Sequence, residues 1–131
     1  MKFETSFVLD GDLIVIDAVV VGPSGQAHVQ LVLDTGAVLT TLVPNVAQAI
    51  GYSAAASIMP TVTRTATASE HGYLIQLEEL STLGITVPGL HVNVADLGYG
   101  VDGVLGMNLL LDYNIEIRPA ERRIIIERIA P

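Results

Sequence analysis

Gln30-Leu31-Val32-Leu33-Asp34-Thr35-Gly36-Ala37 places a carboxylate directly at the end of an apolar run. Burial raises the cost of that charge, so an unpaired carboxylate there would stay protonated. Thr35 offers a hydroxyl that can hold the loop, and Gly36 lets backbone N–H groups approach the carboxylate closely. The triplet alone is also typical of an Asx-turn that closes a hairpin, so it needs a second motif beside it.

The second motif is the stretch Asp102-Gly103-Val104-Leu105-Gly106-Met107-Asn108-Leu109-Leu110. It is an apolar–apolar–Gly run that leads directly into a predicted short helix. In combination the two motifs are more specific than either motif alone.

The rest of the chain is dominated by alternation of period two, which is typical of short strands separated by turns. We predict one domain over residues 1–131 and a mostly β, closed or partly closed barrel with one or two short helices. The expected elements are a hairpin of 13–21 and 26–33, a helix over 44–50, a flap-like hairpin over 61–80 turning at His71-Gly72, a strand over 87–94, a helix over 106–113, and a terminal hairpin of 115–118 and 122–129.

With both motifs in this order, the sequence resembles the retropepsin-like aspartic proteases, the single-lobed, retroviral type, from about Leu13 to Ile129. The resemblance implies a small closed β-barrel that acts as a homodimer and hydrolyses peptide bonds with an activated water, without a metal or cofactor. It implies that Asp34 is the catalytic carboxylate, that Thr35 grips its counterpart in the partner subunit, and that Gly36 gives backbone support.

The same resemblance implies which residues contact a peptide or protein substrate. The hairpin tip from Thr65 to Gly72 would be a flap that closes over the substrate, and Val104, with Tyr99 to Asp102 before it, would wall the side-chain pockets. The substrate-binding residues expected are Ala37, Thr67, Ala68, Ser69, Val101 and Val104.

The sequence departs from the retroviral pattern at two places. Retroviral enzymes have acidic residues after the D-T-G-A and an arginine after the later glycine, whereas this chain has Val38, Leu39 and Met107. Apolar residues replace charges on both sides, which favours a different dimer interface. The flap segment Ala68-Ser69-Glu70-His71 also lacks the glycines of a viral flap tip.

Composition restricts the partners. A net charge of −8 disfavours nucleic acid, and no apolar run of about 18 residues exists that could span a membrane. Half of the residues are hydrophobic and 15% are charged, which predicts that a partner subunit covers some apolar surface. The three histidines have no metal-binding spacing, and cysteine is absent. The acidic N-terminal segment does not fit a signal peptide, so we expect a cytoplasmic protein.

Several alternatives remain open from the sequence. A catalytically silent dimerisation or peptide-binding module could keep this fold, although the intact D-T-G-A favours an enzyme. A generic β-barrel with a coincidental triplet is a third interpretation. Asp102-Gly103 fits a turn, or Asp102 faces the cleft and favours basic side chains. The run Ile124 to Ile126 is apolar on both faces, and we predict an edge strand that the second subunit covers.

Overall fold

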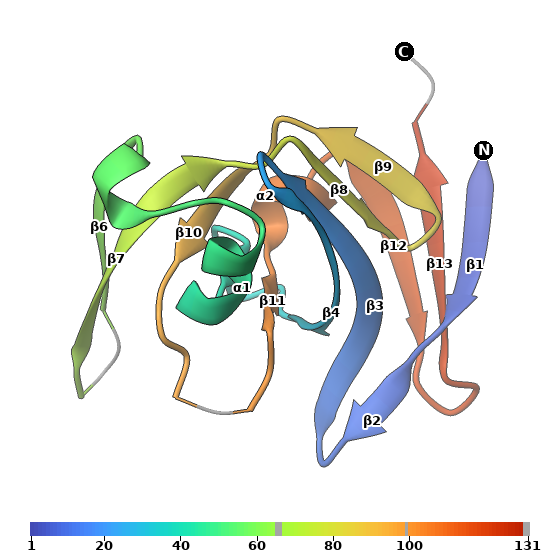
Figure 1. The fold of residues 1–131 in the computed structure, drawn as a ribbon. Coiled ribbons are helices and arrows are strands. Elements are labelled where there is room, and N and C mark those ends of the chain that lie inside the picture. Colours follow the sequence, from blue (N-terminus) through green and yellow to red (C-terminus); the bar gives the residue numbers. More distant parts are fainter. Residues whose placement is uncertain (65–66, 99, 130–131) are drawn as a thin grey trace.

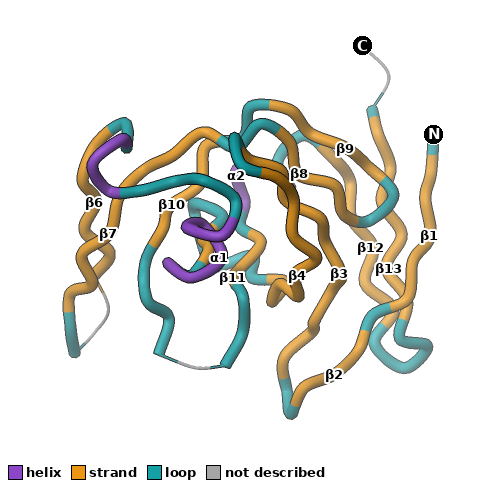
Figure 2. Tube along the Cα trace, in the orientation of Figure 1, coloured by secondary structure: helices purple, strands orange, loops and turns teal. Residues whose placement is uncertain are grey.

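The computed structural model describes residues 1–64, 67–98 and 100–129. Strands dominate, with two short α-helices and one 3₁₀ turn between them (Figures 1 and 2), which confirms the mostly β fold class. The elements are β1 Lys2–Ser6, β2 Val8–Asp10, β3 Leu13–Gly22, β4 Gly25–Leu33, β5 Thr41–Leu42, α1 Pro44–Ala49, η1 Ala54–Ala56, β6 Met59–Arg64, β7 Ser69–Gln76, β8 Glu79–Thr82, β9 Ile85–Pro88, β10 His91–Val94, β11 Gly103–Leu105, α2 Met107–Leu110, β12 Tyr113–Arg118 and β13 Arg123–Arg128.

The main sheet has the strand order β6-β7-β10-β5-β11-β4-β3-β8-β9, with β2 paired to β3 beside this path. It curls around the apolar core as a half-barrel (Figure 1). The β3–β4 hairpin carries the longest pairing of the sheet, from Val15↔Val32 to Gly22↔Gly25. Alternate residues of β3, namely Ile16, Ala18 and Val20, are buried, as period-two alternation predicts.

The helix α1 begins and ends where the sequence indicates. Pro44 occupies its first turn, where a missing N–H costs nothing, and Gly51 follows its end with a φ of +103°. Ala47 and Ile50 are buried. Figure 1 shows α1 between the β6–β7 hairpin and β3, so the helix fills the curve of the sheet.

The chain ends form a separate three-stranded sheet in the order β1-β13-β12. Strand β13 lies in its centre and pairs with β1 and β12 of the same chain, with Ile124 and Ile126 at most 1% exposed. The expectation that this strand lies at a sheet edge is therefore wrong. The N-terminal strand β1, which the sequence analysis missed, occupies that edge.

Three other expected boundaries differ from the structure. The flap turn does not lie at His71-Gly72, because both residues belong to β7 and pair with Val62 and Thr61 of β6. The strand expected over 87–94 is two strands, since Gly89, with a φ of +70°, separates β9 from β10. The helix expected over 106–113 is shorter, and Tyr113 already pairs with Arg128 in the terminal sheet.

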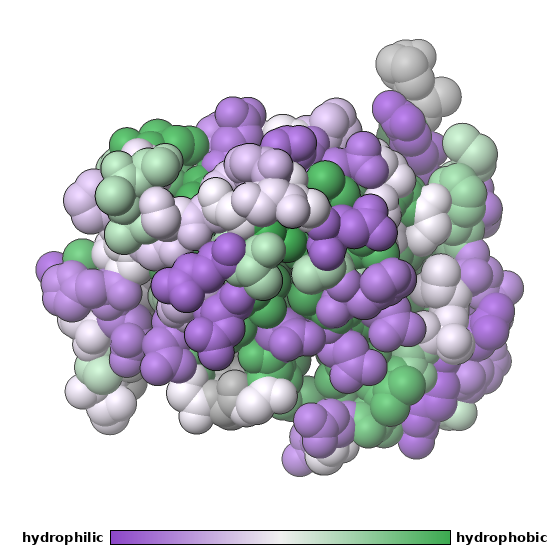
Figure 3. All heavy atoms as spheres, in the orientation of Figure 1, coloured by the Kyte–Doolittle hydropathy of each residue, from purple (hydrophilic) through white to green (hydrophobic). Residues whose placement is uncertain are grey.

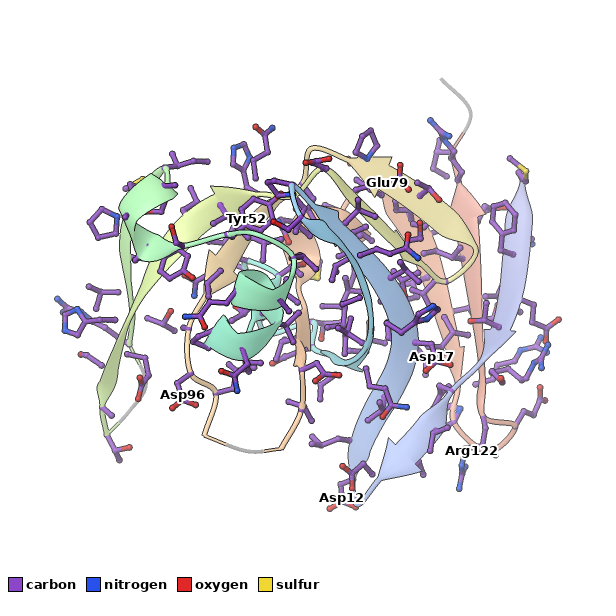
Figure 4. All side chains as sticks on the ribbon, in the orientation of Figure 1. Asp12, Asp17, Tyr52, Glu79, Asp96 and Arg122 are labelled. Carbon is purple, nitrogen blue, oxygen red and sulfur yellow. The ribbon has the colours of Figure 1, made fainter. Side chains whose placement is uncertain are left out.

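A tyrosine connects the segment after α1 to the main sheet. The Tyr52 hydroxyl donates to the Gln76 carbonyl at 2.9 Å and accepts from the Glu78 amide at 3.1 Å (the side chain is labelled in Figure 4). Burial raises the pKa of Tyr52. The hydrogen bond from the Glu78 amide lowers this pKa by a smaller amount, and the negative charge of Glu78 raises it. The hydroxyl therefore stays protonated and keeps both hydrogen bonds at neutral pH.

We expect Tyr52→Phe to lower the free energy of unfolding by about 1–2 kcal/mol, because it leaves two backbone groups without their partner. Denaturant unfolding at neutral pH measures this, with Tyr73→Phe as the control, since the Tyr73 hydroxyl has no hydrogen bond among the described residues. Because the folded pKa of Tyr52 is raised, its contribution should be complete at neutral pH and be lost as the pH rises through that value. Equal stability losses in the two variants would contradict this role.

Candidate active site

The two motifs meet where β4 and β11 lie side by side. They pair in parallel, Gly103 with Leu31, Val104 with Val32 and Leu105 with Leu33. Just beyond, the Asp34 amide donates to the Leu105 carbonyl at 3.1 Å. The D-T-G loop therefore leaves the sheet beside Gly106 of the second motif.

The D-T-G loop turns its carboxylate outward. The Gly36 amide donates to Asp34 Oδ1 at 2.8 Å, and the Ala37 amide donates to the Asp34 carbonyl at 3.2 Å. Asp34, Thr35 and Gly36 are exposed. This is Asx-turn geometry, but the loop does not close a hairpin, because the next strand, β5, pairs with β10 and β11 and not with β4. The local turn thus serves a loop that presents a carboxylate.

The first two residues of α2 hold the D-T-G loop in place by backbone hydrogen bonds. The Met107 amide donates to the Ala37 carbonyl at 2.8 Å, and the Asn108 amide donates to the Val38 carbonyl at 3.0 Å. Gly106 makes this approach possible, because a Cβ there would lie 2.7 Å from the carbonyl carbon and oxygen of Leu39. The second motif therefore needs its glycine for space, not for an unusual φ.

A polar bracket that the sequence analysis did not single out completes this support. Asn108 Oδ1 accepts from the Thr40 amide at 2.9 Å and from the Thr40 hydroxyl at 2.8 Å, and the same hydroxyl accepts from the Gly106 amide at 3.1 Å. Asn108 Nδ2 donates to the His91 carbonyl at 2.7 Å. The sequence signal for this bracket was a polar residue beside apolar neighbours at two places, Thr40 and Asn108. In the structure Thr40 is fully buried.

Comparison with known proteins gives the family. The model of a family described as "Aspartyl protease" matches residues 17–109, which include the first motif, the second motif as far as Leu109, and the bracket. The chain belongs to the aspartyl protease family. Its fold is that of a retropepsin: a crystal structure of a retropepsin-like aspartic protease from Rickettsia conorii matches with a TM-score of 0.73 and 20% sequence identity, over 98% of this chain and 92% of that one. No curated protein matches the sequence.

In this member of the aspartyl protease family, the β6–β7 hairpin contains the residues that were expected to form a flap. It projects from the body, on the same side as the connection between β10 and β11 (Figure 1). Its strands pair as far as Arg64↔Ser69, so the tip lies between these residues; Thr67 and Ala68 are exposed there, and Ser69 begins β7. Thr65 and Ala66 lie outside the described residues. The substrate-binding roles of Thr67, Ala68 and Ser69 stay predictions.

The base of this hairpin is tied to β10. The Thr61 hydroxyl donates to Asn93 Oδ1 at 2.5 Å, and a Cβ on Gly72 would lie 2.2 Å from the Val94 carbonyl oxygen. Asn93 is only 4% exposed. The hairpin therefore projects from a fixed base.

The other expected pocket residues lie near the two motifs. Ala37 is half-buried beside the Asp34 loop, and Val104 is buried in β11, where it pairs with Val32. Val101, half-buried, lines two hollows together with Asp102, and Asp34 lines neither. Tyr99 lies outside the described residues. Their roles in substrate binding stay predictions.

Within the described part of the chain, Asp34 has no ion pair and no hydrogen bond to a second carboxyl group. Its one side-chain partner there is the Gly36 amide. The described residues also contain no group of three His, Cys, Asp or Glu arranged to hold a metal ion. No helix in this part of the chain is long and apolar enough to cross a membrane.

The Thr40–Asn108 bracket should be a large local contribution to stability. We expect Asn108→Ala to lower the free energy of unfolding by about 2–4 kcal/mol, because it leaves the buried Thr40 amide and hydroxyl without an acceptor. Asn114→Ala is the matched control, since Asn114 is exposed and its side chain makes one hydrogen bond among the described residues, to Glu127. Denaturant unfolding measures both, and a loss in Asn108→Ala no larger than in the control would contradict the bracket.

Proposed function

We propose that the chain is an aspartic endopeptidase whose catalytic dyad consists of Asp34 from each of two identical subunits. The observation that carries this proposal is the Asp34 carboxylate, exposed at the junction of the two motifs and held by the Gly36 amide. A single chain has one D-T-G, so a dyad needs a two-fold axis between two copies of it.

The proposed chemistry follows from placing two carboxylates about 3 Å apart. Aspartic protease dyads share one proton, because two like charges at that distance cannot both be ionised. The ionised carboxylate takes a proton from a water held between the two, and that water attacks the peptide carbonyl. The protonated carboxyl group stabilises the developing oxyanion, and a proton then passes to the leaving amine. Thr35 would hold its counterpart, and the Gly36 amide would keep each carboxylate in place.

The surface around the loop supports pairing with a second copy. Val38 is 78% exposed immediately after the D-T-G-A, and Leu111 is 71% exposed after α2. Leu39 and Met107 are half-buried, so Val38 offers the exposed apolar contact at this place. Because β13 is paired on both sides within its own chain, we place the proposed dimer contact on the surface around the D-T-G loop rather than on β13.

A mixed peptide library tests the proposal. We expect cleavage that a general aspartic protease inhibitor stops, with a rate that falls on both sides of an acidic to mildly acidic optimum, because one carboxyl group must be ionised and the other protonated. A rate that climbs steadily into alkaline solution, or that ignores the inhibitor, would point to a different nucleophile. Binding of peptides without any cleavage would favour a silent peptide-binding module.

A further inference from the structure

We infer that this protease prefers substrates with a lysine or arginine beside the scissile bond, held in a hollow between β2 and the segment before β11. The inference rests on the proposed function and adds the substrate class. The hollow is lined by the apolar residues Val8, Leu9, Val15 and Val101 and by the carboxylates of Asp10 and Asp102.

The strand register places this hollow on the same side of the sheet as Asp34. Parallel pairing sets Val104 beside Val32, and two steps back along both strands sets Asp102 beside Gln30. Side chains two residues apart share a face, so Gln30, Val32 and the start of the D-T-G loop lie in one row. Four residues of strand separate Gln30 from Asp34, about 13 Å. An extended lysine or arginine side chain covers about half of that distance, and the Asp34 side chain and the substrate backbone at the reacting bond take up the rest.

Asp102 is held rigidly at the wall of the hollow. Its Oδ2 accepts from the Gln30 amide at 2.9 Å, and its carbonyl accepts from the Val43 amide at 3.0 Å. Its Oδ1 has no hydrogen bond among the described residues. A fixed carboxylate with one unused oxygen is suited to a cationic partner, because little conformational entropy is lost when the contact forms. This favours the second of the two interpretations of Asp102 offered by the sequence.

The lining matches the shape of a basic side chain. Lysine and arginine have apolar stems that pack on aliphatic surface and a charged head that needs acceptors. Val8 is 65% exposed and Leu9 39% exposed, so their side chains are available as that surface. Figure 3 shows apolar surface at the lower edge of the molecule, over β2 and the start of β3, with hydrophilic residues around it.

The charge distribution points to the same substrate. Residues 7 to 112 contain ten acidic residues and one basic residue, Arg64. Every ion pair among the described residues lies instead in the terminal sheet and its turn, as in Arg123–Glu4 and Arg118–Glu116. The carboxylates of residues 7 to 112 therefore make no ion pair among the described residues, and their excess of negative charge attracts cations.

Two peptides that differ at one position test the inference. One carries lysine next to the scissile bond and the other carries norleucine, which keeps the stem and lacks the ammonium group. We expect cleavage efficiency about tenfold higher for the lysine peptide, the size of one charge-assisted contact, and a smaller ratio at high salt. In Asp102→Asn the ratio should fall towards one, while the amide oxygen still accepts from the Gln30 amide and keeps the fold.

Glu79→Gln is the matched control, because Glu79 is an exposed acid at the opposite edge of the molecule (Figure 4), and it should keep the ratio. Binding of the same two peptides to the Asp34→Asn protein, with and without Asp102→Asn, separates specificity from catalysis. Loss of all cleavage with a preserved lysine preference in binding would overturn the proposed function alone. If proteins that keep Asp102 cleave and bind the lysine and norleucine peptides equally well, this inference is overturned.

Discussion

Replacement of Asp34 by asparagine is expected to abolish peptide hydrolysis, by at least about a thousandfold, and to leave the fold intact. An amide cannot take a proton from the attacking water, so neither member of the dyad can start the reaction. The Gly36 amide keeps its acceptor, because the asparagine carbonyl oxygen takes the place of Asp34 Oδ1. Pairing of the subunits should be unchanged or tighter, since the repulsion between two close carboxylates is gone.

The chain offers a closely matched control for this variant. Asp96 is also exposed, and its Oδ1 accepts from the Gly98 amide at 2.9 Å in the same turn geometry. Asp96→Asn should retain hydrolysis. Steady-state cleavage, with circular dichroism and sedimentation of both variants, measures the difference. Activity of purified Asp34→Asn close to that of the original protein would remove Asp34 from the mechanism.

The second large effect is expected from Gly106→Ala. The added methyl group would lie 2.7 Å from the backbone carbonyl of Leu39 and 2.9 Å from the Ala37 oxygen, and backbone atoms cannot turn aside as a flexible side chain can. Either the D-T-G loop or the start of α2 must move, which breaks the Met107–Ala37 hydrogen bond. We expect a loss of about 3 kcal/mol or more in the free energy of unfolding, and loss of activity in any protein that still folds.

Gly100→Ala provides the comparison, because no atom lies within 4 Å of the place its Cβ would take. It should change stability by less than about 0.5 kcal/mol. The denaturant concentrations at which the two variants are half unfolded measure the difference in stability. A Gly106→Ala protein as stable as Gly100→Ala would mean that the close contact between the two motifs is not required.

The sequence predicted the elements that local signals specify. The β3–β4 hairpin has a Gly-Pro-Ser-Gly turn between two apolar strands, and α1 has Pro44 at its start and Gly51 after its end. The two motifs lie side by side, as expected, although no local pattern required β4 and β11 to pair in parallel. That expectation came from resemblance to a known family, and the long-range contact itself could not be read from either stretch.

The errors arose where tertiary context decides. His71-Gly72 has turn chemistry, yet Gly72 lies within β7 because the Val94 carbonyl passes too close for any side chain. The run Ile124 to Ile126 is apolar on both faces, which suggested an edge strand. In the structure β1, from the N-terminal end of the chain, pairs with it. Thr40 and Asn108 are single polar residues whose importance depends on a contact across 68 positions. Such contacts leave no periodic signal.

Co-refolding of two proteins tests the shared catalytic site most directly. The original protein and Asp34→Asn are mixed in denaturant and refolded together, so that subunits assort at random. A dyad built from two copies of Asp34 predicts that an equal amount of the variant lowers the activity of the original protein to about half, because mixed dimers lack one carboxylate. Activity that stays unchanged at every excess of the variant would mean that one chain is sufficient, and would contradict the shared site.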